Sequence, residues 1–73
     1  MRYLLQKSKS VADGWVCTDT ENRIVVEWRQ GLFNETQNVV MLDDYHGDVM
    51  DLARLMREMG DWLAVNHKDK VMK

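Results

Sequence analysis

The densest group of side chains that could do chemistry is a short acidic stretch with one imidazole. It contains Asp43, Asp44, Tyr45, His46 and Asp48. Carboxylates and an imidazole can bind a metal ion, but a calcium loop of the EF-hand type needs oxygen ligands at alternating positions and a glutamate at the twelfth. Because the spacing does not provide them, we interpret the stretch as a polar connection that ends in a helix cap. We expect no metal site here.

The residue types that often act in catalysis have no suitable partners in the sequence. Cys17 alternates with Trp15 and Ile24 on one predicted sheet face, where a thiol behaves as a small hydrophobic side chain. His67 lies about 28 Å from His46 if the intervening residues, roughly 19 of them, are helical, so the two imidazoles cannot share a site. The sequence contains no glycine-rich phosphate loop, no nucleophile elbow and no zinc-protease motif. We therefore expect a protein that is not an enzyme and binds no cofactor.

Length and composition predict one small folded domain, residues 1–73. A chain of 73 residues has room for one core, and its apolar fraction of 45% is normal for a globular protein. No stretch is apolar for long enough to cross a bilayer or to act as an export signal. The single cysteine allows no internal disulfide. We expect the protein to reside in a reducing cytoplasm, with no membrane contact.

Four segments have the composition of β-strands, and all of them precede the helical pattern. They are residues 2–7, 15–18, 23–29 and 36–42. Residues 30–35 are expected to form a loop. This order predicts an α+β fold in which residues 1–43 form a three- to four-stranded antiparallel meander, packed against one C-terminal amphipathic helix (β-β-β-β-α).

The two central segments predict a hairpin with one buried face. A four-residue turn at 19–22 would pair Thr18 with Arg23. In that register Cys17 lies across from Ile24, and Trp15 lies across from Val26. The residues expected to face inward are Trp15, Cys17, Ile24, Val26 and Trp28. A slip of one residue would turn this whole set toward solvent.

The predicted helix covers residues 48–67. Asp48 is a suitable N-cap, and Asp51 places a carboxylate near the positive end of the helix dipole. The apolar residues fill a continuous arc of about 200° on the helical wheel. Those expected to lie over the sheet are Leu52, Met56, Met59 and Leu63. Gly60 lies within the arc, where we expect it to let the helix approach the sheet.

The remainder of the C-terminal half is predicted to be solvent-exposed. Two ion pairs at i,i+4 spacing, Arg54–Glu58 and Arg57–Asp61, are expected on the outer face of the helix. Residues 68–73 form a basic tail that is expected to fray.

The leading hypothesis is a non-enzymatic binding module that acts through protein contact, as a homodimer or with another protein. The apolar arc is wider than one small sheet needs. Three more apolar residues are expected outside the core, and surplus apolar surface is typical of a contact site. These candidate partner-binding residues are Leu32, Phe33 and Met50.

A nucleic-acid-binding alternative rests on the order of the elements. The predicted order is similar in layout to the PC4-like transcriptional coactivators, which dimerise through such elements and bind single-stranded nucleic acid on the sheet. The similarity covers element order alone and transfers no residue to this chain. The cations that could neutralise a nucleic-acid backbone are Lys7, Lys9, Arg23 and Arg29. Residues 34–67 hold two Lys/Arg against seven Asp/Glu, so nucleic acid is possible but not favoured.

A second alternative is an acidic inhibitor that imitates the phosphates of nucleic acid. The carboxylates that could form such an imitation are Asp43, Asp44, Asp48 and Asp51. The competing explanation is that an acidic band keeps the helix soluble.

Overall fold

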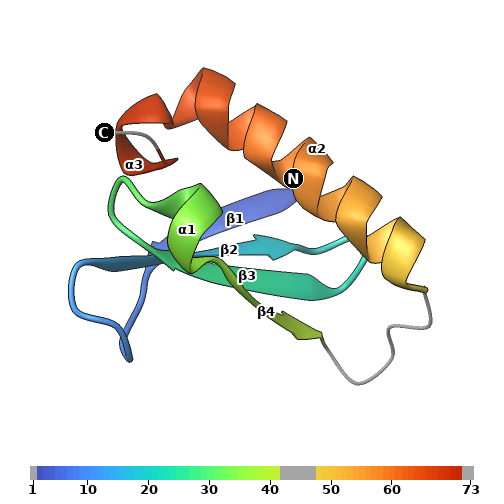
Figure 1. Cartoon of the computed structure of the whole chain (residues 1–73), viewed down its shortest axis with the longest axis horizontal. Coiled ribbons are helices and arrows are strands. Elements are labelled where there is room, and N and C mark those ends of the chain that lie inside the picture. Colours follow the sequence, from blue (N-terminus) through green and yellow to red (C-terminus); the bar gives the residue numbers. More distant parts are fainter. Residues whose placement is uncertain (1, 42–47, 72–73) are drawn as a thin grey trace.

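A computed structural model of the chain describes residues 2–41 and 48–71. The elements are β1 (Tyr3–Lys7), β2 (Gly14–Asp19), β3 (Ile24–Arg29), α1 (Phe33–Thr36), β4 (Asn38–Met41), α2 (Val49–Asn66) and α3 (Lys68–Val71). The strands form one antiparallel sheet in the order β1-β2-β3-β4, and α2 crosses one face of it (Figure 1). The predicted α+β fold, an antiparallel meander followed by a helix, is confirmed.

The β2–β3 hairpin has a register that differs by two residues from the expected one. The observed pairs include Trp15 with Trp28, Cys17 with Val26, and Asp19 with Ile24. Asp19 therefore belongs to β2, and its carboxylate accepts hydrogen bonds from the backbone N–H groups of Glu21 and Asn22 in the following turn. Because side chains alternate with a period of two, this shift leaves every side chain on its predicted face.

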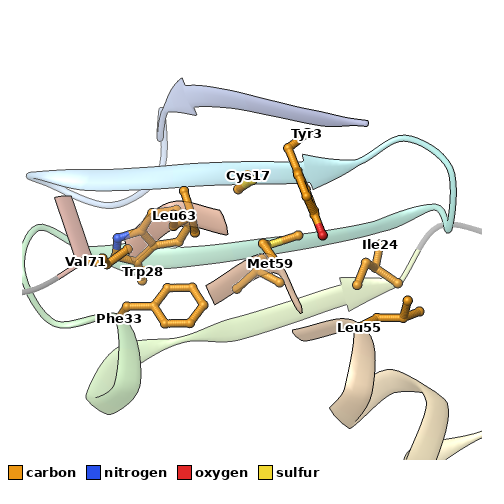
Figure 2. Close-up of a cluster of buried hydrophobic side chains, with 10 residues drawn as sticks. Tyr3, Cys17, Ile24, Trp28, Phe33, Leu55, Met59, Leu63 and Val71 are labelled. Atoms are coloured by element: carbon orange, nitrogen blue, oxygen red, sulfur yellow. The ribbon is translucent and has the colours of Figure 1, made fainter. Parts of the chain in front are cut away.

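The core lies between the inner face of the sheet and α2 (Figure 2). Its buried hydrophobic residues come from β1, β2, β3 and all three helices: Tyr3, Cys17, Ile24, Val26, Trp28, Phe33, Leu55, Met59, Leu63 and Val71. Of the residues expected to face inward or to cover the sheet, Trp15, Leu52 and Met56 are only partly buried at its margin.

Two segments that the sequence predicts to be irregular are helical and packed against Trp28. Instead of a loop at 30–35, helix α1 begins at Phe33, whose ring lies edge-on to Trp28 with the centroids 5.0 Å apart. Instead of a frayed tail, residues 68–71 form α3, in which Val71 is buried. The indole N–H of Trp28 donates to the Lys70 carbonyl at 2.9 Å. A buried tryptophan needs apolar neighbours and an acceptor for its N–H, and these two segments supply both.

The long helix α2 begins as predicted, because the Asp48 carboxylate accepts a hydrogen bond from the Asp51 N–H at 2.8 Å. Gly60, however, faces α1 rather than the sheet: a Cβ there would lie 3.4 Å from Cε1 of Phe33. Within the described residues, no helix is both long and apolar enough to span a membrane.

Candidate functional site

The three candidate partner-binding residues do not form one surface. Phe33 is 6% exposed and packs against Trp28. Leu32 is half-buried at the start of α1. Met50 is 79% exposed in the first turn of α2. Only Met50 therefore has the exposure that the sequence predicts for a contact residue.

The four candidate nucleic-acid-binding cations are distributed over different parts of the sheet. Lys7 shares the inner face with its pairing partner Trp15, and its ammonium lies 5.9 Å from the indole centroid. Arg29 lies on the opposite face by the alternation of β3. Lys9 is in the β1–β2 connection and Arg23 is in the β2–β3 turn, at opposite ends of β2. The structure does not bring these four side chains together.

Of the four candidate mimic residues, Asp43 and Asp44 lie outside the described residues. Asp48 acts as the N-cap of α2. Asp51 has a carboxylate oxygen 3.6 Å from a guanidinium nitrogen of Arg54 on the same helix. Within the described part of the chain, no group of three or more His, Cys, Asp or Glu side chains is placed to hold a metal ion.

A groove lies between α1 and α2, with a volume of about 450 Å³. Phe33 and Val71 form its apolar floor, together with Met56. Along α2 it is lined by residues without long side chains, namely Ala53, Gly60 and Ala64. Their spacing of seven and four residues places them on one side of the helix. Small residues on α2 and the separate position of α1 together create the groove.

The rim of the groove is polar and carries both signs of charge. Asn34 and Gln37 border it on the α1 side, and Arg57 and Asp61 border it on the α2 side. The predicted Arg57–Asp61 ion pair is not formed, and neither side chain has another ion pair within residues 2–41 and 48–71; the predicted Arg54–Glu58 pair is present at 3.0 Å. Two exposed charges beside an apolar floor are therefore available to a bound molecule.

Met50 lies in a hollow that adjoins the groove. Ala53 and Arg57, which line the groove, also line a shallower hollow that includes Met50 and Arg54. This hollow lies along the exposed first turns of α2, where Val49 and Met50 are 81% and 79% exposed. One of the predicted contact residues is in this way adjacent to the site that the structure presents.

A second feature is the corner around Trp15. The ammonium groups of Lys7 and Lys70 lie 5.9 and 5.1 Å from the centroid of its indole ring. Its N–H donates to the Gln30 side chain, which in turn donates to the Asp69 carbonyl. The Trp15 indole therefore connects α3 to the sheet through these contacts. A nucleobase that stacks on this ring would compete with these two lysines.

Two buried titratable groups, Asp19 and Cys17, have pKa values that are shifted by their surroundings. Burial raises the pKa of Asp19, but hydrogen bonds from Arg2 and Asn22 outweigh it, so the pKa is below its ordinary value. Burial raises the pKa of the Cys17 thiol to about 12. A thiol with this pKa and no exposure is protonated and out of reach of a substrate.

The groove is not among the sites that the sequence predicts. The sequence feature that could have indicated it is the row of small residues Ala53, Gly60 and Ala64 at one edge of the apolar arc. Comparison of the chain with protein-family models, with curated proteins and with solved structures finds no match.

Proposed function

We propose that this protein is a non-enzymatic binding module that acts through protein contact, and that the groove between α1 and α2 receives an apolar segment of another protein. The observation that carries the proposal is the groove itself, about 450 Å³ with an apolar floor and a charged rim. Binding sites are usually concave and mostly apolar, with a few polar groups that orient the ligand. A reducing cytoplasm is the proposed setting, since the chain has one cysteine, a free thiol.

The chemistry of the groove favours an amphipathic helix as the bound segment. A helix presents apolar side chains at i, i+3 or i+4 and i+7, and these can enter a narrow apolar groove in a row. The absence of long side chains at Ala53, Gly60 and Ala64 leaves room for a helix backbone to approach α2. Arg57 and Asp61 can then pair with charged residues on the polar side of the bound helix.

The test uses two substitutions one residue apart on α2. Ala64→Phe fills the groove with a large side chain, whereas Val65→Phe places the same side chain at a position that is 83% exposed. Each protein is immobilised and used to capture partners from lysate of the source cells. A captured protein is then purified and titrated against both variants by calorimetry. We expect the wild-type protein and Val65→Phe to bind equally, and Ala64→Phe to bind at least about tenfold more weakly.

Equal binding by all three proteins would contradict the proposal, because the groove would then have no part in recognition. Circular dichroism of each variant establishes that the fold is retained. A partner that is lost with Val65→Phe and kept with Ala64→Phe would move the contact to the other side of α2.

The nucleic-acid alternative is tested by titrating a labelled single-stranded oligonucleotide at two salt concentrations. Binding that weakens with added salt would support it, because neutralised phosphates release counterions. It receives less support than protein contact, since Lys7 and Arg29 lie on opposite faces of the sheet. The mimic alternative predicts capture of a basic nucleic-acid enzyme that Asp43→Lys with Asp44→Lys no longer binds.

A further inference from the structure

The outer edge of β1 is not paired with another strand among the described residues. β1 is the first strand of the sheet, and within residues 2–41 and 48–71 it pairs only with β2. It has five residues in continuous register with β2, without a bulge or a proline, and its one charged residue is Lys7 at the end. Proteins usually protect a free edge with charges, prolines, bulges or a covering element, and an edge without them is a site for pairing with another chain.

The hydrogen bonds at the two ends of β1 show which backbone groups face β2. The Thr20 N–H donates to the Arg2 carbonyl at 2.7 Å, and the Ser8 N–H donates to the Gly14 carbonyl at 2.9 Å. Arg2 and Ser8 are therefore positions that bond to β2. Bonded and non-bonded pairs alternate in an antiparallel ladder, so the even-numbered residues between them bond to β2 as well.

The odd-numbered residues of β1 consequently direct their backbone groups away from β2. These residues are Tyr3, Leu5 and Lys7. Their N–H and carbonyl groups have no hydrogen-bond partner among residues 2–41 and 48–71. They form a regular row of donors and acceptors along the edge of the sheet.

Apolar side chains flank this row. Leu5 is half-buried at the margin of the core. Beside it Tyr3 contacts Trp62 of α2, with the ring centroids 4.9 Å apart. On the outer face of β1, Leu4 is 47% exposed.

We propose that two copies of this chain pair through their β1 strands, antiparallel about a twofold axis at Leu5, and so join their four-stranded sheets into one continuous sheet. In this register Leu5 pairs with Leu5 of the second copy, and Tyr3 pairs with Lys7. All the free backbone groups of β1 are then bonded. The two Lys7 ammonium groups lie at opposite ends of the seam, so these like charges do not face each other.

This pairing uses a different surface from the groove and goes beyond the proposed function. Gly60 lines the groove, and Trp62 lies beside β1. The two positions are about 160° apart around α2, which places the groove and the seam on opposite sides of the helix. The dimer would leave both grooves open, so a failure of one proposal does not affect the other.

The test uses the fact that residue 5 faces itself across the twofold axis. Leu5→Lys and Leu5→Glu each place like charges opposite each other in a dimer, while the half-buried position lets the charged group reach solvent in the monomer. Sedimentation velocity at tens of micromolar should show a wild-type dimer and an association at least about tenfold weaker in each variant. An equimolar mixture of the two variants should associate again, because opposite charges then face each other.

Val25→Lys is the matched control, since Val25 is also half-buried but lies on the outer face of the central strand β3. It should associate like the wild-type protein. A wild-type monomer at these concentrations would overturn the proposal. A dimer that persists in both Leu5 variants would also overturn the proposal. Loss of the dimer in Val25→Lys would overturn it too, because that result would indicate packing between sheet faces. A mixture of variants that does not associate would overturn the register.

Amide hydrogen exchange of the wild-type protein tests the same seam without substitution. The N–H groups of Leu4 and Gln6 should be protected at every concentration, because they bond to β2. Those of Leu5 and Lys7 should become protected only as the concentration rises and the dimer forms. Fast exchange of Leu5 and Lys7 in a sample that sediments as a dimer would place the interface elsewhere.

Discussion

Substitution of Asp19 by asparagine should cause a large loss of stability, because this carboxylate connects three parts of the fold. It is the buried charged residue among the described ones, with no exposure to solvent. One of its oxygens accepts hydrogen bonds from Nε and Nη2 of Arg2 at 3.1 and 2.9 Å, and also from Nδ2 of Asn22 at 3.0 Å. The other accepts from the N–H groups of Glu21 and Asn22, both at 3.1 Å.

The expected cost follows from what asparagine can and cannot replace. Its amide oxygen can still accept the bonds from the turn, but its NH₂ group would face the guanidinium of Arg2 and cannot accept from it. Removal of one partner from a buried ion pair costs about 3–5 kcal/mol. Because the Arg2 side chain is 29% exposed and retains Glu58 at 3.0 Å, we expect the lower end, about 3 kcal/mol. The free energy of unfolding of a typical small protein is about 5–15 kcal/mol, so this loss is a substantial part of it.

The pH dependence provides a second, independent test. The folded-state pKa of Asp19 is lower than its ordinary value, so the stability it contributes is fully present above the unfolded-state pKa of about 3.9. That contribution is lost as the pH falls through the folded-state pKa. The difference between the wild-type protein and Asp19→Asn should therefore be constant from about pH 5.5 to 8 and decrease below about pH 4.

Urea unfolding followed by tryptophan fluorescence measures both effects. Glu58→Gln is the control, since it removes the other carboxylate that binds Arg2 at a site open to solvent, where ion pairs contribute little. Its loss of stability should be much smaller than that of Asp19→Asn. A loss below about 1 kcal/mol for Asp19→Asn, or a difference that persists unchanged to pH 3, would refute the assignment of Asp19 as the charged centre of the fold.

Three further predictions test the core and the segments packed against it. Burial raises the pKa of Cys17 to about 12, so this thiol should react with a thiol reagent at pH 8 only after denaturant is added. The free energy of unfolding should fall as the pH rises from about 9 toward 12. Rapid labelling of the native protein would contradict the burial of Cys17. Gly60→Ala should raise the free energy of unfolding by about 0.5–1 kcal/mol in a urea titration, because alanine favours a helix over glycine. The new Cβ would lie 3.4 Å from Phe33, which is an ordinary contact distance. A decrease would show that α1 cannot accommodate a methyl group. Val71→Asp should cost about 2 kcal/mol, because it places a carboxylate in the core and releases α3. The tryptophan emission of the protein should then shift to longer wavelength as Trp28 loses its cover. Unchanged emission would contradict the packing of α3 on Trp28.

The sheet could be predicted from the sequence in its faces but not in its register. Alternation has a period of two, so it cannot distinguish registers that differ by two residues. The register was decided by Asp19, whose side chain binds the turn that follows and thereby extends β2 by one residue beyond Thr18. Sequence analysis placed Asp19 in the turn because aspartate is common there.

The short helices were missed for a different reason. α1 and α3 have four residues each, too few for a helical period to be visible. They form where Trp28 reaches the end of β3 and needs cover for its ring and an acceptor for its N–H. That requirement depends on tertiary structure, since Lys70 is 42 residues away in the sequence. Capping by Asp48, in contrast, is local, and it could be predicted.

The apolar arc of α2 is wider than one small sheet needs, which predicts one surplus contact surface. In the structure the arc is divided between several neighbouring elements. Between the two flanks of the arc, Leu55, Met59 and Leu63 are buried against the sheet. One flank carries Trp62 beside the free edge of β1. The other flank lines the groove that α1 makes with α2. A helical wheel shows only the width of an arc, and the positions of neighbouring elements decide how many surfaces it supplies. Because the two flanks lie on opposite sides of the helix, one copy of this chain can pair with another through β1 while it holds a partner segment in its groove.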